Sequence, residues 1–146
     1  MYEGYSRQAL PSKKYRELLG SAVCVFNSNN AFIIENILKN DQANEYSWHE
    51  LIDHTSGQLS TAVKNTITRQ SNTDIAKSFN EIIEIRNRIM HSFQVTSYEK
   101  SDDVDGQILS TKYKNGKQEV ITIEFLLDFI RKNESLAIKL HDFRGN

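Results

Sequence analysis

Apolar residues recur every three to four positions along most of this chain, the spacing of helices that bury one face. The pattern predicts helices over residues 6–19 and 21–39, and Gly20 either separates these two helices or is absorbed between them. A third helix starts at the cap Ser47 and ends or bends at Gly57, and helix continues over 58–69. Two further helices are predicted over 74–92 and from the cap Thr122 to about Gly145.

The pattern changes between the last two helices. Residues 93–98 alternate weakly, and residues 108–113 and 118–121 flank the sequence Lys-Asn-Gly-Lys. An Asn-Gly pair between such runs is a strong signal for a β-hairpin. The chain is therefore predicted to form an all-α bundle of about five helices with a β-hairpin inserted before the last helix.

Length and composition restrict the class of protein. The chain has 146 residues and a net charge of −1, which fits a single domain over 1–146 and argues against a protein that coats polyanions. The single cysteine, Cys24, lies in an apolar run, where we expect it to pack as a small hydrophobe. Without a disulfide, a signal-peptide pattern or an apolar segment long enough to cross a bilayer, we expect a cytoplasmic protein that does not enter membranes.

The candidate chemistry lies near the end of the predicted helix over 74–92. Arg86, Asn87 and His91 fall within two helical turns. A guanidinium beside an imidazole can hold a phosphate and move its protons without a metal. On an ideal helix, however, Arg86 and His91 are turned apart by about 140°. Either the arginine side chain wraps around, or the helix ends before His91, or a second copy of the chain supplies the missing group.

Arg86 also continues an apolar stripe of the same helix. That stripe consists of Phe79, Ile82, Ile89 and Phe93. A charge in such a stripe indicates a partner, an interface or a water-lined cleft. A purely structural alternative is a salt bridge from Arg86 to an acid on another helix, with His91 and Arg88 favouring the negative end of the helix dipole. Glu84 and Arg88 are four residues apart and are expected to form a surface ion pair.

An arginine, a polar residue directly after it, three more residues and a histidine, late in a helix of a bundle, resemble the motif of the HEPN superfamily. Many HEPN proteins are metal-independent endoribonucleases of toxin–antitoxin, antiphage and CRISPR-linked systems. Their pattern allows four to six residues between arginine and histidine, and here Arg86 and His91 enclose four. The resemblance covers about residues 15–93 and the final helix, while the hairpin is an addition.

The resemblance implies a homodimer in which two such motifs meet across the two-fold axis. Catalysis would be attack of an RNA 2′-hydroxyl on its own phosphodiester, with His91 as general acid or base. Arg86 would hold the phosphate, and Asn87 would orient His91 or the phosphate. DNA lacks this nucleophile, so RNA is the expected substrate. No cofactor is implied, and no metal is expected, because the carboxylates and histidines lack metal-ligand spacing.

The resemblance leaves several biological roles open. The leading one is a toxin or antiphage effector, with a possible antitoxin or regulatory protein as partner. The alternative is a non-catalytic module of the same fold that binds RNA, a nucleotide or a partner protein. A third option is a toxin silenced by nucleotidylation, but the members so regulated usually carry a tyrosine where this chain has Met90.

Further polar residues are candidates for RNA contacts. We include Arg88 of the motif helix and Asn29 and Asn30, which lie inside a long apolar helix. The two asparagines can equally form hydrogen bonds within the core or face solvent. The run from Lys112 to Lys114 interleaves basic and aromatic residues, as RNA-binding surfaces do, although a solvated hairpin face explains it as well. Trp48 is expected to anchor the core.

Overall fold

The computed structural model describes residues 3–97 and 106–145. These residues form a mostly helical protein with one small sheet, which confirms the helical class and the predicted strands before the last helix. The elements are α1 (Lys13–Lys39), α2 (Trp48–Asp53), α3 (Ser56–Val63), the π-helical turn η1 (Lys64–Thr68), α4 (Asp74–Met90), β1 (Phe93–Thr96), β2 (Gln107–Lys112), β3 (Gln118–Ile121) and α5 (Ile123–Arg144).

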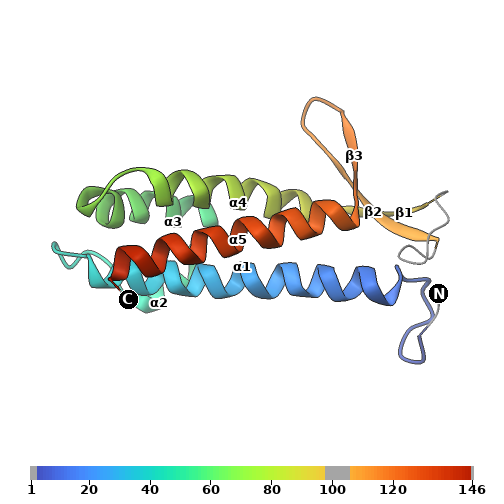
Figure 1. The fold of residues 1–146 in the computed structure, drawn as a ribbon, viewed down its shortest axis with the longest axis horizontal. Helices are drawn as coiled ribbons and strands as arrows, with labels where there is room; N and C mark the ends of the chain where they lie inside the picture. The colour runs from blue at the N-terminus through green and yellow to red at the C-terminus, as the bar shows by residue number, and fades with distance from the viewer. Residues whose placement is uncertain (1–2, 98–105, 146) are drawn as a thin grey trace.

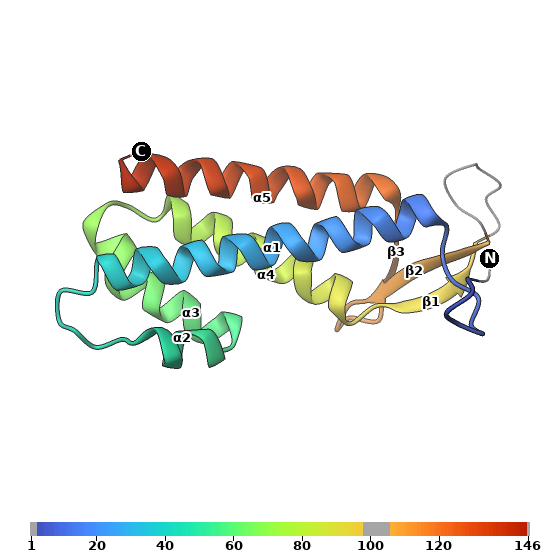
Figure 2. The same cartoon turned by 90° about the horizontal axis from the view of Figure 1, so that it is seen from below.

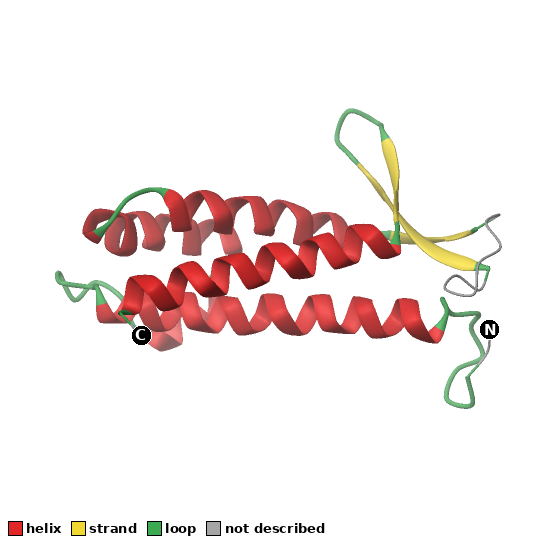
Figure 3. Cartoon of the chain, viewed as in Figure 1, coloured by secondary structure: helices red, strands yellow, loops and turns green. Residues whose placement is uncertain are grey.

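Three long helices set the shape of the molecule. Helices α1 and α5 lie side by side and run in the same direction, while α4 runs back in the opposite direction (Figures 1 and 2). The strands lie together at one end of this bundle (Figure 3). The end of α4 and the start of α5 therefore both lie beside the sheet.

Helix α1 starts later than predicted and settles the two alternatives left open at Gly20. Residues 6–12 are not helical, because Ser12 caps the helix by accepting a hydrogen bond from the Tyr15 N–H at 3.1 Å. Gly20 lies within the uninterrupted helix, so the two predicted helices are one. The buried stripe of α1 continues past Gly20, from Tyr15 to Ala22, and this burial offsets the weak helix propensity of glycine.

The next two helices are separated two residues earlier than predicted. Thr55, not Gly57, marks the boundary, since Thr55 and Gln58 form a reciprocal capping box at the start of α3. The predicted cap Ser47 is confirmed, because its hydroxyl accepts from the Glu50 N–H at 3.3 Å. Trp48, directly after that cap, is 51% exposed, so the expectation of a core anchor was wrong.

The sheet contains one more strand than the predicted hairpin. Strands β2 and β3 pair antiparallel, and Gly116 in their turn adopts a φ of 89°, a conformation that favours glycine. Strand β1 adds to the free edge of β2, with Phe93 opposite Ser110. The insertion is therefore a three-stranded antiparallel sheet. The last residue of the predicted extended segment, Tyr98, lies outside the described residues.

Tyr15 joins the helical bundle to the sheet. Its side chain is fully buried, and its hydroxyl donates to the Ile121 carbonyl at 2.5 Å and accepts from the Leu109 N–H at 3.2 Å. Burial raises the pKa of Tyr15 from 10.0 to about 12, and the hydrogen bond from Leu109 opposes this rise. One hydroxyl thus ties the start of α1 to β2 and to the end of β3.

Two other expectations have an outcome in the fold. Cys24 is exposed on α1 and has a free thiol, so the expectation that it packs in the core was wrong. Across the described part of the chain, we find no helix with the length and apolar character needed to span a bilayer.

Replacing Tyr15 with phenylalanine should lower the free energy of unfolding at pH 7 by about 1–3 kcal/mol, because the Ile121 carbonyl and the Leu109 N–H then lose their partner. Urea unfolding of the wild type and Y15F, followed by circular dichroism, measures this difference.

The same pair of proteins tests the ionisation of Tyr15. The folded state holds the phenol proton more tightly than the unfolded chain, because the pKa is raised on folding. The stabilisation is therefore complete below about pH 10 and is lost as the pH rises toward 12. The gap in unfolding free energy between wild type and Y15F should narrow over this range. A gap independent of pH would contradict the burial of this hydroxyl.

Candidate functional site

Helix α4 ends one residue before His91. His91 is the C-cap, and its N–H donates to the Asn87 carbonyl at 3.0 Å. The Ser92 hydroxyl donates to the Ile89 carbonyl at 2.6 Å and so satisfies another group of the last turn. Of the three ways to bring Arg86 and His91 together, the structure thus contains an early helix end. This end does not bring the two side chains into contact within one chain, since neither the hydrogen bonds nor the ion pairs of the described residues join them.

Arg86 lies half-buried against an aromatic ring of another helix. Its guanidinium carbon is 5.2 Å from the centre of the Phe26 ring on α1, and its Nη1 donates to Asn87 Oδ1 at 3.2 Å. Among the described residues no carboxylate forms an ion pair with Arg86. The structure therefore does not support a salt bridge as the reason for this arginine.

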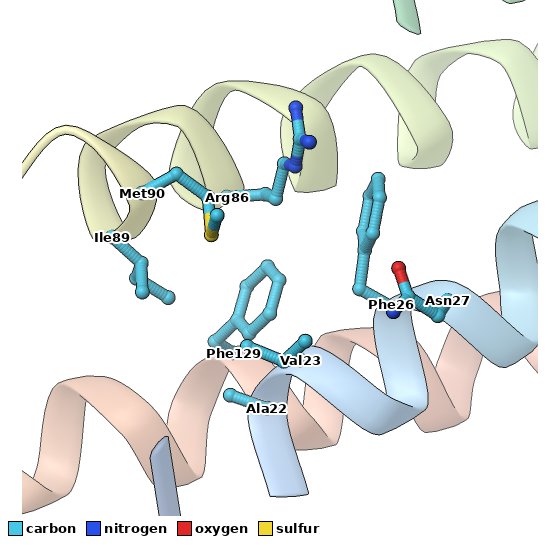
Figure 4. A pocket seen from close by; sticks show the side chains of 8 residues that line it. All are labelled: Ala22, Val23, Phe26, Asn27, Arg86, Ile89, Met90 and Phe129. Carbon is cyan, nitrogen blue, oxygen red and sulfur yellow. The ribbon is translucent and has the colours of Figure 1, made fainter. Parts of the chain in front are cut away.

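A small pocket of about 120 Å³ surrounds the arginine. Figure 4 shows that α4 contributes Arg86 and Met90, α1 contributes Val23, and α5 contributes Phe129. We call this the motif pocket; its polar lining residues are Asn27 and Arg86, and its apolar lining residues are Ala22, Val23, Phe26, Ile89, Met90 and Phe129. Val23 is 38% exposed and Met90 is 55% exposed, so apolar side chains border the pocket at the surface.

The electrostatics of the motif pocket favour an anion. A partly desolvated charge is costly unless a counter-charge or hydrogen bonds compensate it. The Phe26 ring stabilises the cation of Arg86 by only about 0.5–2 kcal/mol, and Asn87 offers one neutral acceptor. A phosphate oxygen would complete the coordination of this guanidinium.

The other two motif residues lie beside Arg86. Asn87 is half-buried and links both, since its side chain accepts from Arg86 and its carbonyl accepts from the His91 N–H. The His91 side chain is exposed, and none of the described residues makes a hydrogen bond, ion pair or ring contact with it. The imidazole is thus accessible to a substrate or to a second subunit.

Arg88 binds the hairpin and not the motif pocket. Its Nη1 donates to the Lys112 carbonyl at 3.0 Å, and its guanidinium carbon lies 5.6 Å from the centre of the Tyr113 ring. The expected ion pair with Glu84 is confirmed, at 3.8 Å. Because Arg88 follows Arg86 by two residues, the two side chains leave the helix in directions about 200° apart.

The two candidate asparagines of α1 are not brought to the motif pocket. Asn29 is 5% exposed, and its Nδ2 donates to the backbone oxygen of Asn133 at 2.8 Å and to its Oδ1 at 3.0 Å. Asn29 therefore bonds α1 to α5 within the core, which was the structural alternative. Asn30 is half-buried on α1, and the described residues give its side chain no hydrogen bond.

The sequence analysis did not identify two residues that shape this region, Phe26 and Val23. Phe26 is an apolar residue within the predicted helix over 21–39, and no local signal places its ring under an arginine of α4. The exposed Val23 could have been noticed, since it is an apolar residue beside the core stripe of α1 and not in it.

Comparison of the chain with models of protein families, with curated proteins and with solved structures gives no match in any of the three. Within residues 3–97 and 106–145, no three histidine, cysteine, aspartate or glutamate side chains are grouped in a way that could hold a metal ion.

Replacing Arg86 with methionine should leave the free energy of unfolding within about 1 kcal/mol of the wild type, or raise it. The substitution loses the contact with Phe26 but also removes an uncompensated charge from an apolar pocket. An arginine that completes a buried ion pair would instead cost about 3–5 kcal/mol.

Arg16→Met is the matched control for this measurement. Arg16 is also half-buried, but it pairs with Glu3 and donates to the Pro11 carbonyl at 2.9 Å. Urea unfolding should show a larger loss for R16M than for R86M. The reverse order would assign Arg86 a structural role.

Proposed function

We propose that this protein is a HEPN-like, metal-independent endoribonuclease that acts as a homodimer. One observation carries the proposal: Arg86 lines the motif pocket, is half-buried, and forms no ion pair with a carboxylate of the described residues. The exposed His91 five residues later supplies the proton-transfer group that such chemistry needs. The resemblance of the motif to that of HEPN ribonucleases also supports the proposed ribonuclease function.

A second copy of the chain is the proposed occupant of the surface beside the motif pocket. Val23 and Met90 leave apolar area exposed around Arg86, and such borders are typical of protein interfaces. A two-fold axis at this surface would place Arg86 of one protomer near His91 of the other. This arrangement provides what one chain lacks, a guanidinium and an imidazole that face the same phosphate.

The proposed reaction needs only groups of the protein and the RNA. A base accepts the proton of the ribose 2′-hydroxyl, and the 2′-oxygen attacks the adjacent phosphorus. The bond from phosphorus to the 5′-oxygen breaks, and an acid returns a proton to that oxygen. The products are a 2′,3′-cyclic phosphate and a 5′-hydroxyl. His91 moves one of these protons, and Arg86 stabilises the charge that develops on the phosphate.

Purified protein should cleave single-stranded RNA in the presence of EDTA and leave these two ends. An RNA with one 2′-deoxyribose at the cleaved position should resist cleavage there. His91→Ala and Arg86→Met should each lower the cleavage rate at least about 100-fold, because each removes a group that acts in the transition state. End-group analysis of labelled RNA and single-turnover rates measure both effects.

His49→Ala is the control variant, because His49 is another exposed histidine and lies on α2. Its cleavage rate should match the wild type. Cleavage that survives in H91A, or that EDTA abolishes, would refute the proposal. Binding of RNA by the wild type without cleavage would favour a non-catalytic RNA-binding module.

A lysine introduced at the proposed interface tests whether the protein dimerises through this surface. Met90→Lys should weaken self-association at least about 10-fold, since the added ammonium would be buried without a partner. Cleavage should fall with dimer content and recover at high protein concentration. Ile138→Lys is the matched control, because Ile138 is 56% exposed on α5 and does not line the motif pocket.

Sedimentation velocity over a range of protein concentrations measures the association of both variants. A wild type that is monomeric while it cleaves RNA would contradict the composite site. Equal effects of M90K and I138K would also contradict it.

A further inference from the structure

A second cavity lies between α4 and the turn that joins β2 to β3. It has a volume of about 490 Å³, within the range of sites for small ligands. We call it the hairpin groove; its lining residues are Glu84, Asn87, Arg88, Tyr113, Lys114 and Asn115. Asn87 connects it to the motif pocket, because the side chain that lines the groove also accepts a hydrogen bond from Arg86 at 3.2 Å.

Arg88 and Tyr113 pack against each other in this groove. The guanidinium of Arg88 lies over the tyrosine ring and is held by the Lys112 carbonyl, and the Tyr113 hydroxyl donates to Glu119 Oε1 at 2.9 Å. Arg88 Nε is buried and has no hydrogen-bond partner among the described residues, although it lies 3.8 Å from Glu84 Oε1 in an ion pair. Planar, partly unsatisfied groups of this kind are what an unstacked nucleobase binds.

The charges of the groove indicate which part of a nucleotide it would hold. Lys114 is exposed and suits a backbone phosphate, whereas the charges of Arg88 and Glu84 offset each other in their ion pair, so the rest of the groove attracts a phosphate less. A carboxylate accepts well from the exocyclic amino group of a base. The groove thus suits a base, and Lys114 suits the backbone.

We propose that the hairpin groove binds one base of a single-stranded RNA next to the phosphate held by Arg86. This inference rests on the proposed function. The base lies on the surface made by Arg88 and Tyr113, Lys114 contacts the neighbouring phosphate, and Glu84 accepts from the amino group. Cytosine is therefore bound more tightly than uracil, which has no exocyclic amino group.

Binding is measured with fluorescent 2′-O-methyl oligocytidine, which lacks the free 2′-hydroxyl and so reports binding without cleavage. Lys114→Ala should weaken binding and lower its dependence on salt by about one phosphate contact. Lys117→Ala removes the same charge from the same turn, but Lys117 does not line the groove, so its affinity should stay near the wild type. Equal losses for both lysines would overturn the proposal.

The aromatic surface has its own matched pair. Tyr113→Leu should weaken binding about 5- to 100-fold, the usual effect of losing one base–aromatic contact. Tyr113→Phe keeps the ring and loses only the bond to Glu119, so it should bind like the wild type. A Tyr113→Leu protein that folds normally and binds with unchanged affinity would overturn the proposal.

Base preference gives a readout that a merely structural role would not change. The wild type should bind 2′-O-methyl oligocytidine more tightly than oligouridine of equal length, and Glu84→Gln should reduce that ratio. A wild type without preference would refute the assignment to Glu84. These oligonucleotides cannot be cleaved, so binding and cleavage are measured separately. If the groove variants bind like the wild type while RNA is still cleaved, this inference alone is overturned. If the groove binds RNA but the protein cleaves none, only the proposed function is overturned.

Discussion

The contact between Phe26 and Phe129 supports the candidate site. The two rings stack with centroids 6.5 Å apart, so they fix α1 against α5 at the level of the motif. Phe26 also carries the guanidinium of Arg86 at 5.2 Å. A shift of α1 or α5 would therefore move the Phe26 ring that contacts the guanidinium of Arg86. The buried hydrogen bonds from Asn29 to Asn133 fix the register of the same two helices one turn further along.

The parts of the fold that could be predicted have local causes. The Asn-Gly turn, the cap at Thr122 and the periodicity of α4 each act within a few residues, and the structure contains all three elements. At Gly20 the sequence left two alternatives open, and packing decides between them: the helix continues, with buried residues of α1 on both sides of the glycine, Tyr15 and Ala22. Ser12 is of the residue type that caps helices, a local signal for a start at Lys13 that the prediction did not use.

The candidate site shows the same division. Its polar residues could be selected from the sequence because they crowd one helix end, but their partners come from distant parts of the chain. Arg86 meets Phe26 of α1, Arg88 meets the hairpin, and Asn29 meets Asn133 of α5. No spacing rule predicts such pairs, since they depend on which helices become neighbours. The assignment of Asn29 to the core therefore required the structure.

The geometry of α4 gives its two arginines different tasks. Residues two positions apart on a helix point in directions about 200° apart, so Arg86 and Arg88 cannot contact the same small ligand. Arg86 enters the motif pocket and Arg88 enters the hairpin groove, while Asn87 lies between them and contacts both regions. In the proposed complex, an RNA strand that fills both cavities must pass Asn87. A polar residue suits this position, because an apolar side chain would remove the acceptor that Asn87 offers Arg86 and could form no hydrogen bond with the passing backbone.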